Sequence, residues 1–236
     1  SVALELRKGE IVGIAGVAGN GQDELLKALS GEILVDAGSI SLDGRGIENL
    51  APNQRRNLGV AIVPEERLGR GAVPNMTLAD NALLTASGQG LVNRGLIRFG
   101  RVREFSREVI RRFGVRCNDE SSTAGSLSGG NLQKYIIGRE ALQNPRLLVA
   151  SHPTWGVDVG SAVAIHEALV QLRDAGAAIV LISEDLDELY QLCNRLGALC
   201  NGRLSPLAST SELSIEQLGQ WMAGEFESAE VNHVAA

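Results

Sequence analysis

The sequence is poor in aromatic residues and cysteines, and it contains no long apolar run. Phe, Trp and Tyr together account for 3% of the 236 residues, so we expect a core of Leu, Val, Ile and Ala. Cys117, Cys193 and Cys200 are odd in number and lack metal-ligand spacing, which suits a reducing compartment better than a disulfide framework. Because no apolar run reaches transmembrane length, we expect a chain that does not itself span a membrane.

Positive charge is also scarce. Lys and Arg number 22 against 28 Asp and Glu, which gives a formal net charge of −6 at pH 7. A nucleic-acid-binding protein usually carries a basic face, so we expect no nucleic-acid partner. The hydrophobic fraction of 44% is ordinary for a globular protein, and the length allows one large domain with an inserted subdomain.

A glycine-rich loop follows the first strongly apolar stretch of the chain. Residues 11–15 are almost wholly apolar, as expected for a strand buried on both faces of a parallel sheet. The spacing G-x-x-x-x-G is intact from Gly16 to Gly21, and the residues after it have helical character. Strand, glycine loop and helix in this order are the context of a phosphate-binding loop. Gln22 and Asp23 stand where Lys and then Ser or Thr would be expected.

These two residues weaken the predicted phosphate site. The missing Lys would supply positive charge to the β- and γ-phosphates, and the missing hydroxyl would hold Mg²⁺. Gln22 donates hydrogen bonds but carries no charge. Asp23 stands in the first helical turn, where the helix dipole favours a carboxylate, and is therefore a candidate to occupy the anion site itself. A carboxylate about 4 Å from a phosphate would cost about 4 kcal/mol at an effective dielectric constant near 20. The alternative is a glycine loop that binds no phosphate.

A second stretch of small residues, at 127–130, precedes a predicted helix at 131–142. Ser128 is a plausible N-cap, and Gly129 and Gly130 let another molecule approach the backbone closely. A helix start of this kind directs free N–H groups and the positive end of the dipole outward, which suits a phosphate. An isolated Ser-Gly-Gly is more often a flexible turn, but here a proline and an apolar strand follow the helix at once.

Three more apolar stretches are each followed by a polar loop. The loops are Pro64-Glu65-Glu66-Arg67 after residues 58–63, Ser151-His152-Pro153-Thr154-Trp155-Gly156-Val157-Asp158 after residues 147–150, and Ser183-Glu184 after residues 178–182. With the glycine loop at the start of the chain and the Ser-Gly-Gly stretch between the first and second of these loops, they resemble the motifs of the ATP-binding cassettes of ABC transporters. The motifs stand in the same order along the chain as in that family. The resemblance covers nearly the whole chain, and the order of the motifs makes it specific.

The resemblance implies a RecA-like α/β P-loop core with an antiparallel β region and an inserted helical subdomain. We expect one nucleotide-binding domain over residues 1–224, with the helical subdomain at about 77–143 and a small hairpin at 37–47. Residues 2–6 alternate as a strand does. We expect the first strand of the fold to lie ahead of residue 1, and residues 225–236 to form a disordered tail.

The same resemblance indicates that several ATP-binding residues are replaced. It places Ser151 where an aspartate organises Mg²⁺, and His152 where a glutamate activates water. Glu65 stands in place of the Q-loop glutamine, and Glu184 in place of the switch histidine. A solvated Glu65 and a hydrogen-bonded core His152 are the alternatives. With the altered glycine loop, these changes predict a degenerate ATP site, no catalytic residue, no metal ligand and almost no hydrolysis by this domain alone.

By contrast, two motifs are intact: the family's signature motif, at Ser128-Gly129-Gly130, and its D-loop aspartate, at Asp158. In the family these parts close over nucleotide held by a second cassette, so Ser128, Gly129 and Gly130 would complete a partner's ATP·Mg²⁺ site. The candidate nucleotide-contacting residues are Gly16, Gly19, Asn20, Gly21, Gln22, Asp23, Glu65, Ser128, Gly129, Gly130 and Asp158.

The motifs most resemble the C-terminal cassette of a fused two-cassette ATPase of bacterial nucleoside or simple-sugar importers. The implied partners are the N-terminal cassette of the same polypeptide, transmembrane permease subunits docked near residues 65–81 and, indirectly, a solute-binding protein, at the cytoplasmic face of the membrane. One alternative is a non-hydrolysing scaffold or regulator. Another is a soluble ABC-type protein acting on DNA or ribosomes, which the acidic balance disfavours. Trp155 stands where the nucleoside branch usually has Arg, and the sequence offers no interpretation of it.

Overall fold

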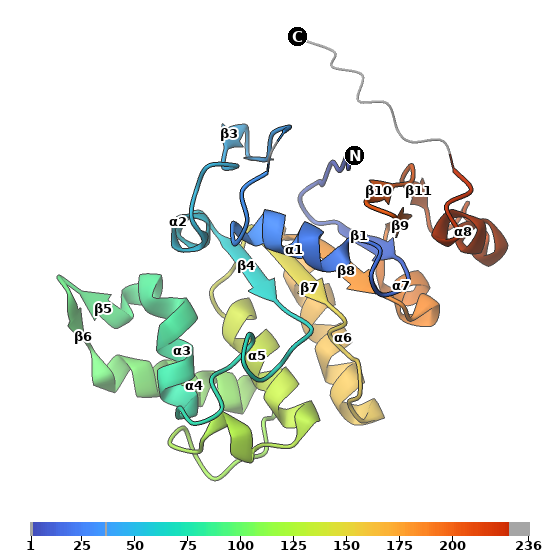
Figure 1. Ribbon diagram of the computed structural model, residues 1–236. Coiled ribbons are helices and arrows are strands. Elements are labelled where there is room, and N and C mark those ends of the chain that lie inside the picture. The colour runs from blue at the N-terminus through green and yellow to red at the C-terminus, as the bar shows by residue number, and fades with distance from the viewer. Residues whose placement is uncertain (1, 36, 227–236) are drawn as a thin grey trace.

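The computed structural model describes residues 2–35 and 37–226, and its centre is a seven-stranded sheet (Figure 1). The strand order is β10-β9-β1-β8-β7-β4, and β11 pairs with β9. Five strands run parallel: β1 (Ile11–Ala15), β4 (Val60–Val63), β7 (Leu147–Ser151), β8 (Ala178–Ser183) and β9 (Arg195–Cys200). The short strands β10 (Arg203–Leu204) and β11 (Ala208–Ser209) pair antiparallel with β9.

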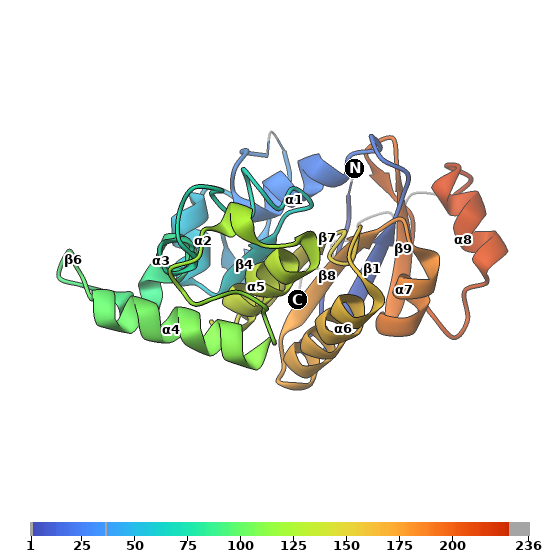
Figure 2. The same ribbon diagram turned by 90° about the horizontal axis from the view of Figure 1, so that it is seen from below.

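The parallel strands are buried on both faces, which explains their continuous apolar sequences. All five residues of β1 are buried, and successive side chains enter opposite layers. Ile11 and Ala15 pack with the helices on one face, whereas Ile14 packs with the first helix on the other. Figure 2 shows the two layers, with α1 on one side of the sheet and α5, α6 and α7 on the other. The predicted parallel core is confirmed.

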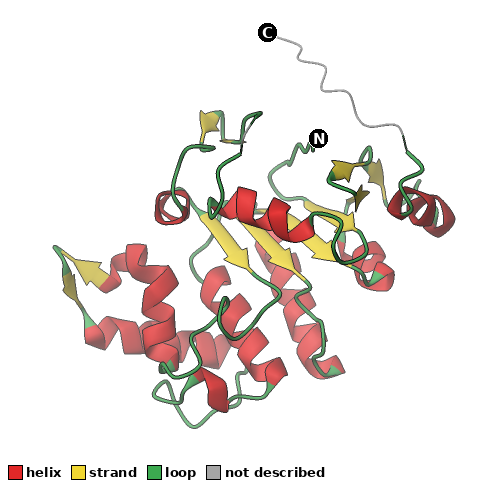
Figure 3. Cartoon of the chain, viewed as in Figure 1, coloured by secondary structure: helices red, strands yellow, loops and turns green. Residues whose placement is uncertain are grey.

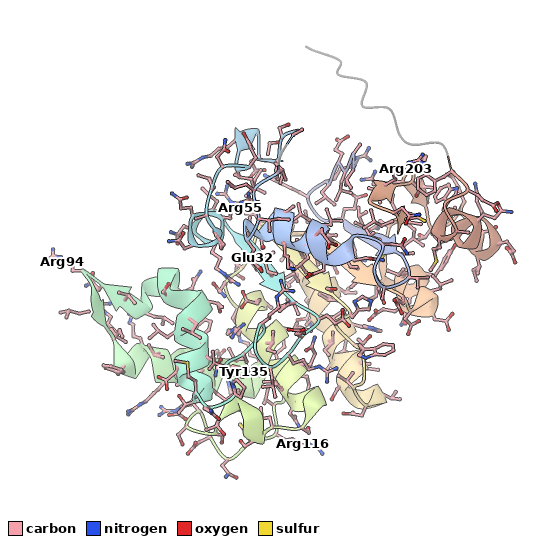
Figure 4. The ribbon with its side chains drawn as sticks, viewed as in Figure 1. Glu32, Arg55, Arg94, Arg116, Tyr135 and Arg203 are labelled. Carbon is pink, nitrogen blue, oxygen red and sulfur yellow. The ribbon has the colours of Figure 1, made fainter. Side chains whose placement is uncertain are left out.

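One layer consists of α1 (Gln22–Ser30), α2 (Pro52–Asn57) and the hairpin of β2 (Ser41–Leu42) and β3 (Arg45–Gly46). The hairpin confirms the antiparallel prediction, and its turn places Asp43 at φ 49°. Arg55 fastens this layer. Its guanidinium donates to the carbonyls of Leu29, Glu48 and Leu50 at 3.0, 2.9 and 3.0 Å, in the position that Figure 4 labels.

The helical insertion extends beyond the β4 edge of the sheet (Figure 3). Its elements are α3 (Leu78–Ala86), an irregular turn at Ser87–Leu91, β5 (Val92–Asn93), β6 (Leu96–Ile97), α4 (Phe99–Arg112), a 3₁₀ turn at Ala124–Ser126 and α5 (Gly129–Ala141). The hydroxyl of Tyr135 joins three of the helices: it lies 2.9 Å from Ser106 Oγ on α4 and donates to the carbonyl of Leu78 on α3 at 2.5 Å.

A buried ion cluster fixes the insertion to the core. Glu140 on α5 is fully buried and contacts Arg56 on α2 at 2.7 Å and Arg139 at 2.9 Å. Arg139 also donates to the carbonyls of Asn81 and Gly71, at 3.1 and 2.9 Å. Burial alone would raise the pKa of Glu140, but the two guanidinium groups outweigh burial and hold the pKa below its ordinary value.

The remaining helices are α6 (Val159–Asp174), α7 (Leu186–Leu192) and α8 (Ile215–Met222). Among the described residues, no helix is both long and apolar enough to cross a membrane. The strand predicted at 2–6 is wrong, because that segment forms no ladder with any described strand. Residues 227–236, most of the predicted disordered tail, lie outside the described residues. Glu225, the first residue of that predicted tail, donates from its backbone nitrogen to the carbonyl of Gln220 at 3.0 Å.

Candidate functional site

The glycine loop connects the carboxyl end of β1 with α1, as its sequence predicts. Gly19 and Gly21 adopt φ values of +88° and +110°, which side-chain-bearing residues rarely adopt. Gly21 is the N-cap of α1 and has no side chain with which to cap the helix. A glycine loop before a helix N-terminus is the arrangement that binds phosphates in P-loop proteins, so the contacts of its N–H groups decide whether this loop can do so.

Side chains of this same chain already fill that loop. The buried amide of Gln22 accepts a hydrogen bond from Asn20 N at 3.0 Å and donates one to the carbonyl of Val17 at 2.9 Å. The carboxylate of Glu184, at the end of β8, accepts from Ala18 N at 2.6 Å. Two donors of the loop are thus held by a glutamine and a carboxylate before any phosphate arrives.

Asp23 does not occupy the anion site for which it was a candidate. Its carboxylate forms ion pairs with Lys27 at 2.5 Å and with Arg70 at 2.7 Å. The hydrogen bond from Lys27, followed by that from Arg70, holds the pKa of this carboxyl below its usual value. The anion nearest the loop backbone is instead Glu184, which the sequence placed only at the switch position.

Glu65, Ser151 and His152 come together at the carboxyl ends of β4 and β7, the edge of the sheet at which the glycine loop also lies. Ser151 Oγ lies 3.1 Å from His152 Nδ1, and Glu65 Oε2 lies 3.4 Å from the same nitrogen. The backbone of His152 is left-handed, with φ 47°, a conformation that is uncommon for a residue other than glycine. Both contacts are made to the Nδ1 atom of His152, so a serine hydroxyl and a carboxylate share one ring nitrogen.

The residues around the glycine loop do not fit a bound Mg²⁺. Mg²⁺ requires oxygen ligands, chiefly carboxylates and waters in octahedral geometry. The carboxylate of Asp23 is engaged by two cations, and Ser151 Oγ is engaged by His152. In the described part of the chain, no group of three or more His, Cys, Asp or Glu side chains is placed to hold a metal ion.

Ser128 occupies the N-cap position of α5, as predicted, but its side chain makes no capping bond and accepts from Asn131 Nδ2 at 2.9 Å. Ser128 and Gly129 are exposed, whereas Gly130 is buried. A side chain at Gly130 would meet Asp158 Oδ2 at 2.8 Å, so the glycine is required by the contact between α5 and the D-loop. The exposed helix start is thus open to a molecule that approaches from outside the chain.

Asp158 caps α6 and thereby fixes the D-loop. Its carboxylate accepts from Ser161 N at 2.9 Å and from Ser161 Oγ at 2.8 Å, and these bonds keep its pKa low. The adjacent Trp155 is 65% exposed, and nothing in the structure explains its identity. The structure therefore brings the candidate residues into two groups, one around the glycine loop and one around the start of α5.

One residue of the second group stood in a motif loop of the sequence, but no role was predicted for it. Arg67 follows β4, and its guanidinium lies against Gly129 and Gly156, which belong to distant parts of the chain. No local spacing links Arg67 to those glycines, so the contact could not be predicted from the motifs.

Comparison with known proteins identifies the family of this chain. Residues 1–155 match the family described as "ABC transporter". The nucleoside import ATP-binding protein NupA of Lactococcus lactis is 41% identical over 224 residues, which is 94% of this chain and 44% of that protein. The glucose import ATP-binding protein TsgD13 of Haloferax volcanii is 38% identical over 227 residues, which is 95% of this chain and 41% of that protein.

A solved ATP-binding subunit of an ABC transporter has the same fold, with a TM-score of 0.77, 23% identity, and coverage of 94% of this chain and 92% of that one. This chain spans less than half the length of both curated relatives. The family match, the relatives and the shared fold lead to one conclusion: this chain belongs to the ABC transporter family, as an ATP-binding cassette.

Proposed function

We propose that this chain is the nucleotide-binding domain of an importer of nucleosides or simple sugars, in which its own ATP site is degenerate and its signature helix completes the ATP site of a partner cassette. The observation that carries the proposal is the contrast between the two groups of residues. Glu184 and Gln22 fill the glycine loop, whereas Ser128 and Gly129 leave the start of α5 exposed.

The partner cassette would be the N-terminal half of the same polypeptide, as the resemblance of the motifs implies, and a relative such as NupA is long enough for a second cassette because this chain spans 44% of it. ATP·Mg²⁺ would bind in the partner's own phosphate loop. The exposed N–H groups and positive dipole end of α5 would then close over the γ-phosphate, where preorganised donors stabilise developing negative charge. Permease subunits would dock near residues 65–81, a solute-binding protein would deliver the solute, and the assembly would sit at the cytoplasmic face of the membrane.

The test is ATP hydrolysis and solute uptake by the complete transporter carrying Gly129→Asp. The added carboxylate would stand at the exposed helix start and repel the γ-phosphate, so we expect hydrolysis to collapse. Gln22→Ala is the matched variant in the other site, and we expect it to be far milder. Thermal melting of each variant reports whether the fold is kept.

The same experiment separates the alternative function, a scaffold or regulator that contacts no nucleotide. The filled glycine loop is compatible with that alternative as well. Unchanged hydrolysis in the Gly129→Asp transporter would favour the scaffold. Equal damage from both variants would contradict the division into one working and one degenerate site.

A further inference from the structure

The guanidinium of Arg67 lies across the start of the signature helix. A side chain built at Gly129 would begin 2.6 Å from Arg67 Nη1, and one built at Gly156 would begin 3.6 Å from Arg67 Nη2. Gly129 is the first residue of α5, and Gly156 precedes the D-loop aspartate. The cation therefore sits between the two segments that the proposed function directs toward a partner's nucleotide.

Arg67 is placed there without an anion of its own. Within residues 2–35 and 37–226, no hydrogen bond or ion pair to its guanidinium is found, in contrast to Arg70 three residues later, which pairs with Asp23 and Glu32. Partial burial lowers the pKa of Arg67, and no acidic neighbour offsets this desolvation. The guanidinium is only partly buried, so an anion arriving from outside the chain beside Gly129 could pair with it.

We propose that Arg67 binds the γ-phosphate of the nucleotide that a partner cassette holds against the start of α5. The inference rests on the proposed function and adds a residue to that site. A guanidinium offers a planar fork of donors that matches phosphate oxygens, and its full charge adds to the partial charge of the helix terminus. Arg67 thereby gives the site a preference for nucleotide that carries a third phosphate.

The experiment measures ATP hydrolysis by the complete two-cassette transporter carrying Arg67→Ala or Arg67→Lys. We expect KM for ATP to rise about tenfold in the alanine variant, which corresponds to about 1.4 kcal/mol. The lysine variant should lie between alanine and the unaltered protein, because it keeps the charge but loses the fork. ADP affinity should stay unchanged in both, since ADP lacks the γ-phosphate.

Arg94→Ala is the matched control. It removes the same charge from the tip of the β5–β6 hairpin, far from the start of α5 in Figure 4, and it should leave KM unaltered. Thermal melting should be unchanged in the Arg67 variants, because no bond to another described residue is lost. The lysine variant keeps the test informative if the alanine variant folds poorly.

Three outcomes would overturn the inference. If KM is unchanged in Arg67→Ala while Gly129→Asp abolishes hydrolysis, Arg67 has no role and the proposed function stands. If KM falls in Arg67→Ala, the guanidinium obstructs the helix start instead of binding phosphate. If Gly129→Asp also leaves hydrolysis intact, the proposed function fails and the inference fails with it.

Discussion

Glu184 Oε1 lies 2.6 Å from the backbone nitrogen of Ala18, although 166 residues separate them in sequence. The contact exists because β1 and β8 are adjacent parallel strands, so the loops after them meet at the same sheet edge. A charged acceptor makes a shorter and stronger hydrogen bond than a neutral one. A nucleotide phosphate entering the glycine loop must therefore displace a carboxylate of the protein.

This contact predicts that Glu184→Gln makes the loop more accessible to nucleotide. The amide keeps the size of the side chain but removes the negative charge next to Ala18, so we expect ATP affinity of the isolated chain to rise by roughly tenfold. Calorimetric titration measures the change. Asp187→Asn, which removes a charge from the adjacent first turn of α7, is the control. Equal affinities in Glu184→Gln and the unaltered chain would show that the carboxylate does not compete with phosphate.

The isolated chain should hydrolyse ATP at or near background, and Gln22→Lys should tighten binding without restoring turnover. The new lysine supplies charge for the phosphates, whereas Ser151 and His152 still provide no carboxylate for metal or water. A phosphate-release assay with Mg²⁺ measures this. Robust turnover by the unaltered chain that is lost in the Gly21→Asp variant would contradict the first expectation. Turnover gained from Gln22→Lys alone would contradict the second.

The parts of this structure that the sequence predicted are those with a local cause. The buried strands, the glycine loop and the turn at Asp43 each follow from a few consecutive residues, and all are present. The strand at 2–6 failed because alternation alone does not supply a pairing partner. The β5–β6 hairpin was missed because its turn, at Arg94 and Gly95, is flanked by strands of only two residues.

The site shows the same limit. Residues that contribute through their own loop, such as Gln22, were recognised from the motif. Contacts that depend on how distant loops meet were not: Glu184 with Ala18, Asp23 with Arg70, and Arg67 with Gly129. Asp23 was a candidate for the anion site because of its place in the first helical turn, whereas Lys27 on the same helix and Arg70 on another loop both pair with its carboxylate.

Two glycine-to-alanine substitutions should change stability in opposite directions. At Gly138 on α5, a methyl group would overlap the ring of Phe113, and we expect a loss of about 1–3 kcal/mol. At Gly219 on α8, an added methyl group would meet no described atom outside the helix's own backbone and its chain neighbours within 4 Å, and removing a helical glycine should give a gain of about 0.5–1 kcal/mol. Urea unfolding of the two variants measures both. A gain for Gly138→Ala would show that the Phe113 ring moves at little cost.

The ionised carboxylate of Glu188 should stabilise the fold at neutral pH, and this contribution to the free energy of unfolding should be lost in acid. Burial alone would raise its pKa, but hydrogen bonds from His166, Thr154 and Ser183 outweigh burial and lower the pKa from the usual 4.5. A depressed folded-state pKa stabilises the protein above the unfolded value, and the stabilisation is lost as pH falls through the folded value. Unfolding free energies between pH 7 and pH 3 should therefore fall less steeply in Glu188→Gln. Parallel curves for the two proteins would exclude this contribution.

The buried cluster of Glu140 with Arg56 and Arg139 fixes one end of α5 to the core. The helix is anchored there at its carboxyl end, while its amino end at Ser128 is exposed. Its 13 residues form a rod of about 20 Å, so a tilt of about 10° about that end would move Ser128 by about 3 Å and separate Gly130 from Asp158, against which it packs. That displacement is the length of one hydrogen bond. A tilt of the insertion by that amount would therefore be enough to change which atoms the start of α5 can reach.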